Sequence, residues 1–235
     1  EKSDVIGTED ILESVQEACV IGGKNVTVIP SFRISTMRAR GDFVTAEDWT
    51  VWKFLEIGRE NRMFSSQSPI VALNYCMGLD YGEHFIDYEN KTCSFDGDEF
   101  RRILEACAEW EQFSEYSANG NEIDGSAAKG DWLFDLQYIG SAMDVVQQER
   151  GEWYDQYVYT GENYSDTLVG YPGWEGGEYP MWAYQIFAIN SASKNKEGAW
   201  DFLEYLLSEE IQSSMRQISG LFPARKDCFE TGLRD

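Results

Sequence analysis

The sequence predicts an α/β fold, because strand-like and helix-like segments alternate along its 235 residues. The clearest strand candidate is the apolar run at 184–189, which is short and continuous, as in strands covered on both faces. The clearest helix candidate is 98–116, where apolar residues recur at three- and four-residue steps. This predicted buried face consists of Phe100, Ile103, Leu104, Cys107 and Trp110.

The first half of the chain follows the same alternation. A helix is expected over 8–21, with acidic residues in its first turn, and a β-branched strand over 25–30. Two further amphipathic helices are expected over 45–62 and 69–77. Thr50 is the expected N-cap within the first of these, because its hydroxyl can accept a hydrogen bond from a backbone amide of the first turn.

The second half predicts a loop at 117–131, a strand at 132–138, a helix at 139–148 and a strand at 167–171. A loop rich in glycine and aromatic residues follows at 170–182. The last long element is a predicted helix that begins after its N-cap, Asn195, and continues to Met215. Phe202 and Leu206 widen its apolar face, so we expect it to pack against two neighbours.

Charge and residue usage argue against several function classes. The net charge of −23 would repel a phosphate backbone, so no nucleic-acid partner is expected. The single histidine, His84, lies among acidic residues in a turn that we expect to be solvated rather than to hold a metal. The five cysteines lack zinc-ligand spacing and do not suggest a disulfide scaffold, and Cys107 is expected to be buried. No cofactor is expected.

A long joint motif runs through 188–230, where a strand, a Ser/Lys/Asn turn, a helix and a Gly/Pro turn follow one another. It resembles the second crossover of extracellular solute-binding proteins of family 1, the sugar-binding receptors of bacterial ABC importers. The matching residues are Ile189, Asn190, Ser193, Lys194, Asn195, Glu197, Ala199, Trp200, Phe202, Leu203, Leu206, Ser208, Glu209 and Glu210. The first crossover of that family is similar to Gly23, Lys24, Pro30, Ser31 and Phe32.

The resemblance implies a periplasmic-binding-protein type II-like fold, mainly its second, C-terminal lobe with remnants of the first. Residues 1–33 would be the remnant of lobe 1 with the first hinge strand, 34–183 would be lobe 2, and 184–235 would return to lobe 1 through the second hinge strand. The segment 25–30 should then lie beside 184–189. Because so little precedes the first crossover, we expect uncovered apolar surface and self-association.

The function implied by the resemblance is capture of an extracellular carbohydrate by hinge closure and its delivery to a membrane permease, without catalysis. The protein would lie at the cell surface on a lipid anchor. The sequence contains no signal peptide and no apolar run long enough to span a bilayer, and it does not begin with Met. We therefore expect the leader and anchor to lie outside the given residues.

The glycine-rich loop carries the expected ligand-binding residues, because sugars need flat apolar faces and carboxylates that bond neighbouring hydroxyls. Trp174, Tyr179 and Trp182 supply the faces, and Glu175 and Glu178 supply the carboxylates. The position after the first crossover adds Phe32 and Arg33, and a strand end adds Tyr138. The alternative is a surface loop whose aromatic side chains pack down onto the protein.

Two other functions stay open at this point. Glu175 and Glu178 could form the acid/base pair of a glycosidase, although a three-residue spacing in a glycine loop does not determine the distance between the carboxylates. The same fold could also serve as a non-transport surface module.

Overall fold

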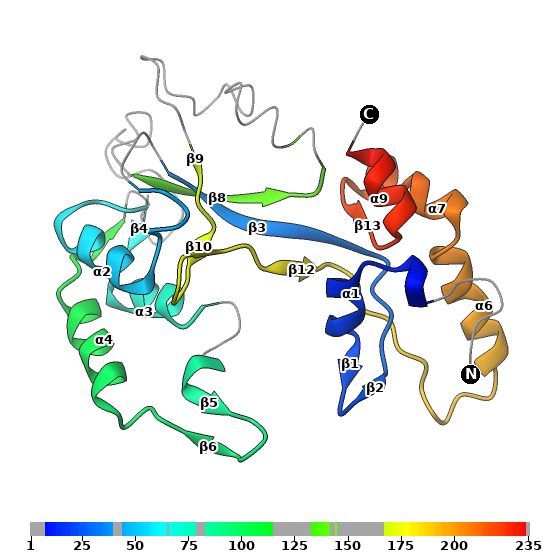
Figure 1. Ribbon diagram of the computed structural model, residues 1–235, viewed down its shortest axis with the longest axis horizontal. Helices are drawn as coiled ribbons and strands as arrows, with labels where there is room; N and C mark the ends of the chain where they lie inside the picture. Colours follow the sequence, from blue (N-terminus) through cyan, green and yellow to red (C-terminus); the bar gives the residue numbers. More distant parts are fainter. Residues whose placement is uncertain are drawn as a thin grey trace. The chain divides into compact units, whose positions relative to one another are not determined.

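The computed structural model describes residues 8–39, 44–64, 66–78, 83–114, 133–141, 144 and 167–233 (Figure 1). Contacts divide the chain into two compact units. Unit 1 comprises Glu1–Ile34, Tyr138–Gln148 and Met181–Asp235, and unit 2 comprises Ser35–Gln137 and Glu149–Pro180. Two of these boundaries lie close to the expected segment boundaries at 33 and 183, whereas the sequence did not suggest that 138–148 belongs to unit 1. The assignment of the units to lobes stays a prediction.

Three helices form one side of unit 2 and lie beside one another: α2 (Val51–Glu60), α3 (Pro69–Cys76) and α4 (Asp98–Ala108) (Figure 1). The predicted N-cap of α2 is confirmed, since the Thr50 hydroxyl accepts a hydrogen bond from the Lys53 amide at 3.2 Å. Ser68 caps α3 in the same way through the Val71 amide at 3.3 Å. Both caps locate the starts of helices that the apolar patterns predicted.

Aromatic side chains dominate the core of unit 2. Trp49 stacks on Phe134 with ring centroids 4.5 Å apart, and its edge meets Phe54. Ile103, Cys107 and Trp110 are buried as predicted. Leu104 is 42% exposed, so its place in the predicted buried face was wrong, because α4 packs with a narrower apolar stripe.

Short antiparallel pairs complete unit 2. They are β4 (Ser66–Gln67) with β7 (Phe113–Ser114), β5 (Ile86–Asp87) with β6 (Thr92–Cys93), and β10 (Tyr171–Pro172) with β11 (Gly177–Glu178). The 3-10 helix η2 (Glu83–Phe85) precedes β5. The strand expected at 132–138 is β8 (Phe134–Ile139), which pairs with β3 (Ser31–Ala39). The strand expected at 167–171 is shorter, β9 (Thr167–Leu168), and also pairs with β3.

Unit 1 is built around the first residues of β3. Strand β12 (Met181–Ala183) pairs antiparallel with β3 and places Trp182 opposite Arg33. Strand β13 (Phe222–Pro223) pairs antiparallel with β3 and places Phe222 opposite Phe32. The N-terminal part of the unit contains η1 (Thr8–Asp10), α1 (Glu13–Ala18) and the hairpin of β1 (Val20–Ile21) and β2 (Lys24–Asn25).

The strand expected at 184–189 is not present as a strand. Its only pairing among the described residues is the bridge between Val28 and Phe187, whose amides and carbonyls bond at 2.8 and 2.9 Å. The expected approach of 25–30 to 184–189 is thus confirmed at one residue pair. Ile186 is 61% exposed, so this segment is not covered on both faces in the described part of the chain.

The long helix expected from Asn195 to Met215 is divided into α6 (Lys196–Leu206), α7 (Glu209–Ser213) and α8 (Met215–Ser219). Asn195 is the N-cap as predicted and accepts from the Gly198 amide at 3.2 Å. Helix α6 ends because the Ser208 hydroxyl donates to the Tyr205 carbonyl at 2.7 Å and Ser208 itself is extended. Phe202 is half-exposed, but its ring meets Phe187 edge-on with centroids 6.2 Å apart, so the predicted second packing face is only partly formed.

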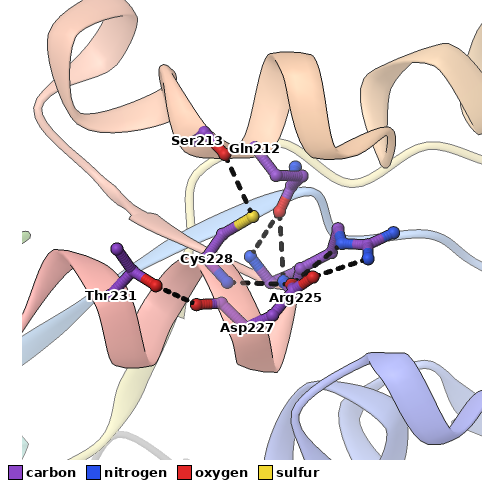
Figure 2. A network of polar contacts seen from close by, with 7 residues as sticks. Gln212, Ser213, Arg225, Asp227, Cys228 and Thr231 are labelled. Carbon is purple, nitrogen blue, oxygen red and sulfur yellow. Dashed lines mark hydrogen bonds and ion pairs between the residues drawn. The ribbon is translucent and has the colours of Figure 1, made fainter.

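A buried glutamine connects the C-terminal elements of unit 1. The Gln212 amide nitrogen donates to the carbonyls of Pro30 and Leu206, and its oxygen accepts from the amides of Ala224 and Arg225. Figure 2 shows this side chain above the start of α9 (Lys226–Gly232), where Arg225 and Asp227 form an ion pair at 2.7 Å. A polar residue on the predicted apolar helix therefore acts as a crosslink between backbone segments.

No helix in the described ranges combines the length and apolar character needed to cross a bilayer. The expected loop at 117–131 and most of the expected helix at 139–148 lie outside the described residues.

Candidate functional site

One group of side chains in unit 1 surrounds a guanidinium. The register of β3 and β12 puts Trp182 directly opposite Arg33, so both side chains lie on the same face of the sheet. The Arg33 guanidinium carbon lies 3.8 Å from the ring centroid of Tyr138, 6.0 Å from that of Trp182 and 5.8 Å from that of Tyr184. We call Arg33, Tyr138, Trp182 and Tyr184 the Arg33 aromatic cluster.

The Arg33 aromatic cluster remains open to solvent. Its three rings are between two fifths and two thirds exposed, whereas Arg33 is half-buried between them. The Arg33 Nε is buried, and among the described residues it has no hydrogen-bond partner. Exposed aromatic faces beside a guanidinium with unused donor capacity can hold a flat ligand that also carries hydrogen-bond acceptors.

Phe32, which the sequence placed with Arg33, points to the opposite face of β3, as neighbouring residues of a strand do. It is 5% exposed and packs on Phe222 and Phe229, with ring centroids 5.5 and 6.1 Å apart. Phe32 therefore belongs to the hydrophobic core of unit 1 and supports the position of Arg33 from behind.

The glycine-rich loop belongs to unit 2 up to Pro180 and is attached to the segment before α2. The Trp49 indole nitrogen donates to the Gly170 carbonyl at 3.0 Å, and the Gly177 amide donates to the Ala46 carbonyl at 2.6 Å. Gly170 has a φ of +79°, which glycine adopts without steric cost. The hairpin of β10 and β11 is therefore held on the helical core of unit 2.

Trp174 lies at the tip of this hairpin and packs on η2. Its ring stacks on His84 with centroids 3.6 Å apart and an interplanar angle of 14°, and Phe85 meets it edge-on. The His84 Nε2 lies 3.0 Å from a Glu99 carboxylate oxygen. One face of Trp174 is thus covered by a histidine that is itself bonded to a carboxylate.

The other predicted residues of the loop are exposed. Glu175 and Glu178 are on the surface of unit 2. The Tyr179 hydroxyl donates to the Leu168 carbonyl at 3.0 Å, and partial burial raises the pKa of Tyr179. In the described part of the chain, no three His, Cys, Asp or Glu side chains are grouped as a metal site would require.

The predicted residues therefore divide between the units. Arg33, Tyr138 and Trp182 come together in unit 1, whereas Trp174, Glu175, Glu178 and Tyr179 belong to unit 2. The sequence analysis missed Tyr184 and the contact of His84 with Trp174. Tyr184 is two residues after Trp182. Because alternate residues of a strand lie on the same face, a strand predicted at 181–183 would have indicated that Tyr184 joins Trp182.

Comparisons with known proteins agree with this fold. Residues 107–213 match the family model described as bacterial extracellular solute-binding protein. An ABC substrate-binding protein from Listeria monocytogenes in complex with cycloalternan has a similar structure, with a TM-score of 0.61, 11% identity, and coverage of 99% of this chain and 61% of that chain. No curated protein matches the chain.

Two further solved structures have the same fold. The solute-binding protein from Thermotoga lettingae bound with α-D-tagatose has a TM-score of 0.57 and 14% identity, covering 98% of this chain and 62% of that chain. The sugar-binding protein MalE from Xanthomonas citri has a TM-score of 0.55 and 14% identity, covering 99% and 61%. The chain spans about three fifths of the length of these solved structures.

Proposed function

We propose that this chain is the ligand-capturing component of an ABC importer and that its ligand is a carbohydrate, because residues 107–213 match the bacterial extracellular solute-binding protein family. The family consists of non-catalytic receptors, so binding and release require no covalent step. The solved proteins of similar fold include ones bound to tagatose and to cycloalternan, which supports a sugar as the ligand class here.

The observation that carries the proposal is the Arg33 aromatic cluster. Pyranose rings present apolar C–H faces and a rim of hydroxyl oxygens. The exposed rings of Tyr138, Trp182 and Tyr184 can stack on such faces, and the guanidinium of Arg33 can donate to the hydroxyl oxygens. Since the guanidinium is held between aromatic rings, little rotamer entropy is lost when it binds.

We assign a second set of contacts to the loop of unit 2. There, Glu175 and Glu178 would accept hydrogen bonds from sugar hydroxyls, and Trp174 and Tyr179 would supply apolar surface. The family resemblance assigns 34–183 to one lobe and the two terminal segments to the other. Hinge closure of two lobes on the sugar would produce the form that a membrane permease recognises. A lipid anchor at the cell surface belongs to the same proposal.

A thermal-shift screen against mono- and oligosaccharides tests the proposal. A ligand that binds only the folded protein raises its stability, by about 2.7 kcal/mol when present at one hundred times its Kd. We expect a sugar to raise Tm, and we expect Trp182→Ala to abolish that shift. Trp200→Ala is the matched control, because Trp200 is a partly exposed tryptophan of unit 1 on α6, bonded to Glu204 and outside the cluster.

The outcomes separate the parts of the proposal. A shift that survives Trp182→Ala but disappears in Trp174→Ala would move the site to the loop of unit 2. If no sugar shifts Tm while amino acids, peptides or polyols do, the receptor function stands and the carbohydrate assignment falls.

A further inference from the structure

Two cysteine side chains meet in the core of unit 2. Cys76 is the last residue of α3, and Cys107 lies in the last turn of α4, the helix packed beside it (Figure 1). Cys76 is 1% exposed and Cys107 is 3% exposed, within the same hydrophobic core. The two thiols are close enough for each to affect the pKa of the other, which is raised for Cys76 and lowered for Cys107.

The other cysteines have different surroundings. Cys93 is exposed on β6. Cys228 and Cys19 are buried in unit 1, and the Cys228 sulfur lies 3.4 Å from the Ser213 hydroxyl. Cys76 and Cys107 are therefore distinguished by their burial in one hydrophobic core, on two helices that pack against each other.

We propose that Cys76 and Cys107 are a disulfide-forming pair, which joins α3 to α4 when the protein folds in an oxidising extracellular compartment. Both thiols lie in one core cluster on helices that pack against each other, which is the arrangement in which side-chain rotation can bring two sulfur atoms together. In the structure described here, both are thiols. The inference does not depend on which ligand the protein binds.

The oxidant is a second disulfide, carried by a small thiol compound or by a thiol–disulfide oxidoreductase. One cysteine thiolate attacks that disulfide, forms a mixed disulfide and releases one thiol. The other cysteine then attacks the mixed disulfide and releases the second thiol, so two cysteine thiols are oxidised and one external disulfide is reduced to two thiols. Interaction with Cys107 and burial raise the pKa of Cys76, whereas interaction with Cys76 lowers the pKa of Cys107, which favours Cys107 as the first nucleophile.

The bond would close a loop of about 30 residues. This loop contains η2 and the hairpin of β5 and β6, and η2 carries His84 and Phe85, the residues that pack on Trp174. A disulfide at its ends would therefore restrict the segment that supports Trp174.

Refolding the chain in a mixture of reduced and oxidised glutathione tests the proposal. Trypsin separates the three cysteines of unit 2, because Cys76, Cys93 and Cys107 fall into the peptides 63–91, 92–101 and 103–129. We expect mass spectrometry under non-reducing conditions to find 63–91 linked to 103–129, and a reductant to separate them. The oxidised protein should unfold at higher urea concentration than the reduced protein.

Cys76→Ala and Cys107→Ala should each remove both the linked peptide and the shift in urea midpoint, whereas Cys93→Ala and Cys19→Ala should retain them. Glutathione attached to the exposed Cys93 shows that the oxidant is active. If Cys93 is modified while Cys76 and Cys107 remain reduced, or if another pair is linked, the proposal is overturned.

Discussion

Arg33 illustrates how one strand residue acquires a different role from its neighbour. Phe32 points into the core of unit 1, and Arg33 points to the face where Tyr138 and Trp182 lie. The position of Arg33 after the first crossover could be predicted from sequence. Tyr138 and Trp182 were also predicted as binding residues, but their contact with Arg33 was not, because it depends on the register of β12 against β3, and the sequence pattern favoured a strand at 184–189 instead.

Gly58 provides a residue-scale prediction. A Cβ atom at this position would overlap the indole ring of Trp110, which is buried against α2. We expect Gly58→Ala to lower the free energy of unfolding by about 1–3 kcal/mol, because a tightly packed core cannot yield without strain. Urea denaturation measures this change.

Gly232→Ala is the control for Gly58→Ala. Gly232 is also helical, and a Cβ atom there would meet no heavy atom within 4 Å. If both variants unfold at the same urea concentration as the parent protein, the packing of Trp110 on Gly58 is not as tight as described.

At the scale of elements, helices with a cap and an apolar stripe were the most predictable parts of the fold. Thr50 and Ser68 act locally, so the starts of α2 and α3 depend only on nearby residues. The division of the helix after Asn195 was not predictable, because apolar residues recur at helical spacing on both sides of Ser208. The Ser208 hydroxyl nevertheless bonds the Tyr205 carbonyl where α6 ends. From sequence alone, Gln212 would likewise be predicted to lie on the surface, because its backbone partners Pro30 and Ala224 are distant in the chain.

The first turn of α9 leads to a pH prediction. Hydrogen bonds from Arg225 lower the pKa of Asp227 from 3.8 to about 2, against the effect of partial burial and with help from the Cys228 amide. A carboxylate whose pKa is lower in the folded protein than in the unfolded chain stabilises the folded state at pH values above the unfolded pKa. This stabilisation is lost as the pH falls from about 4 to 2. Asp227 is half-exposed, so screening limits the contribution to less than about 1 kcal/mol.

We therefore expect Asp227→Asn to lower Tm at pH 6 and to have no effect near pH 2. Asp98→Asn is the matched control, because Asp98 also lies in the first turn of a helix and pairs with Arg101, but on a fully solvated surface. Equal effects of Asp227→Asn at both pH values would contradict the assignment.

At the scale of the whole molecule, each unit is assembled from separated segments of chain. The family resemblance placed two boundaries close to 33 and 183, where the contact-based boundaries fall at 34 and 180. It did not place 138–148 in unit 1, because the local sequence pattern of a segment carries no information about which unit the segment joins.

Large exposed apolar side chains concentrate in unit 1, which leads to a prediction for the molecule as a whole. They include Val20, Ile21, Val26, Tyr184, Ile186, Trp200, Phe202, Tyr205 and Ile218. We expect sedimentation velocity to show association that increases with protein concentration, and Phe202→Ser to weaken it. Ile70→Ser, at a position of unit 2 that is at least as exposed as Phe202, should not weaken it. A monomer at all concentrations would exclude self-association.

The discontinuity of unit 1 also has a consequence for synthesis of the chain. Phe32 packs on Phe222, and Pro30 bonds Gln212, so the core of unit 1 joins residues nearly two hundred positions apart. Unit 2 is complete once residue 180 has emerged, whereas the core of unit 1 must wait for Phe222 and Phe229. During synthesis, the early segments of unit 1 therefore expose apolar side chains until their late partners have been made, and such transiently exposed surface is prone to aggregation.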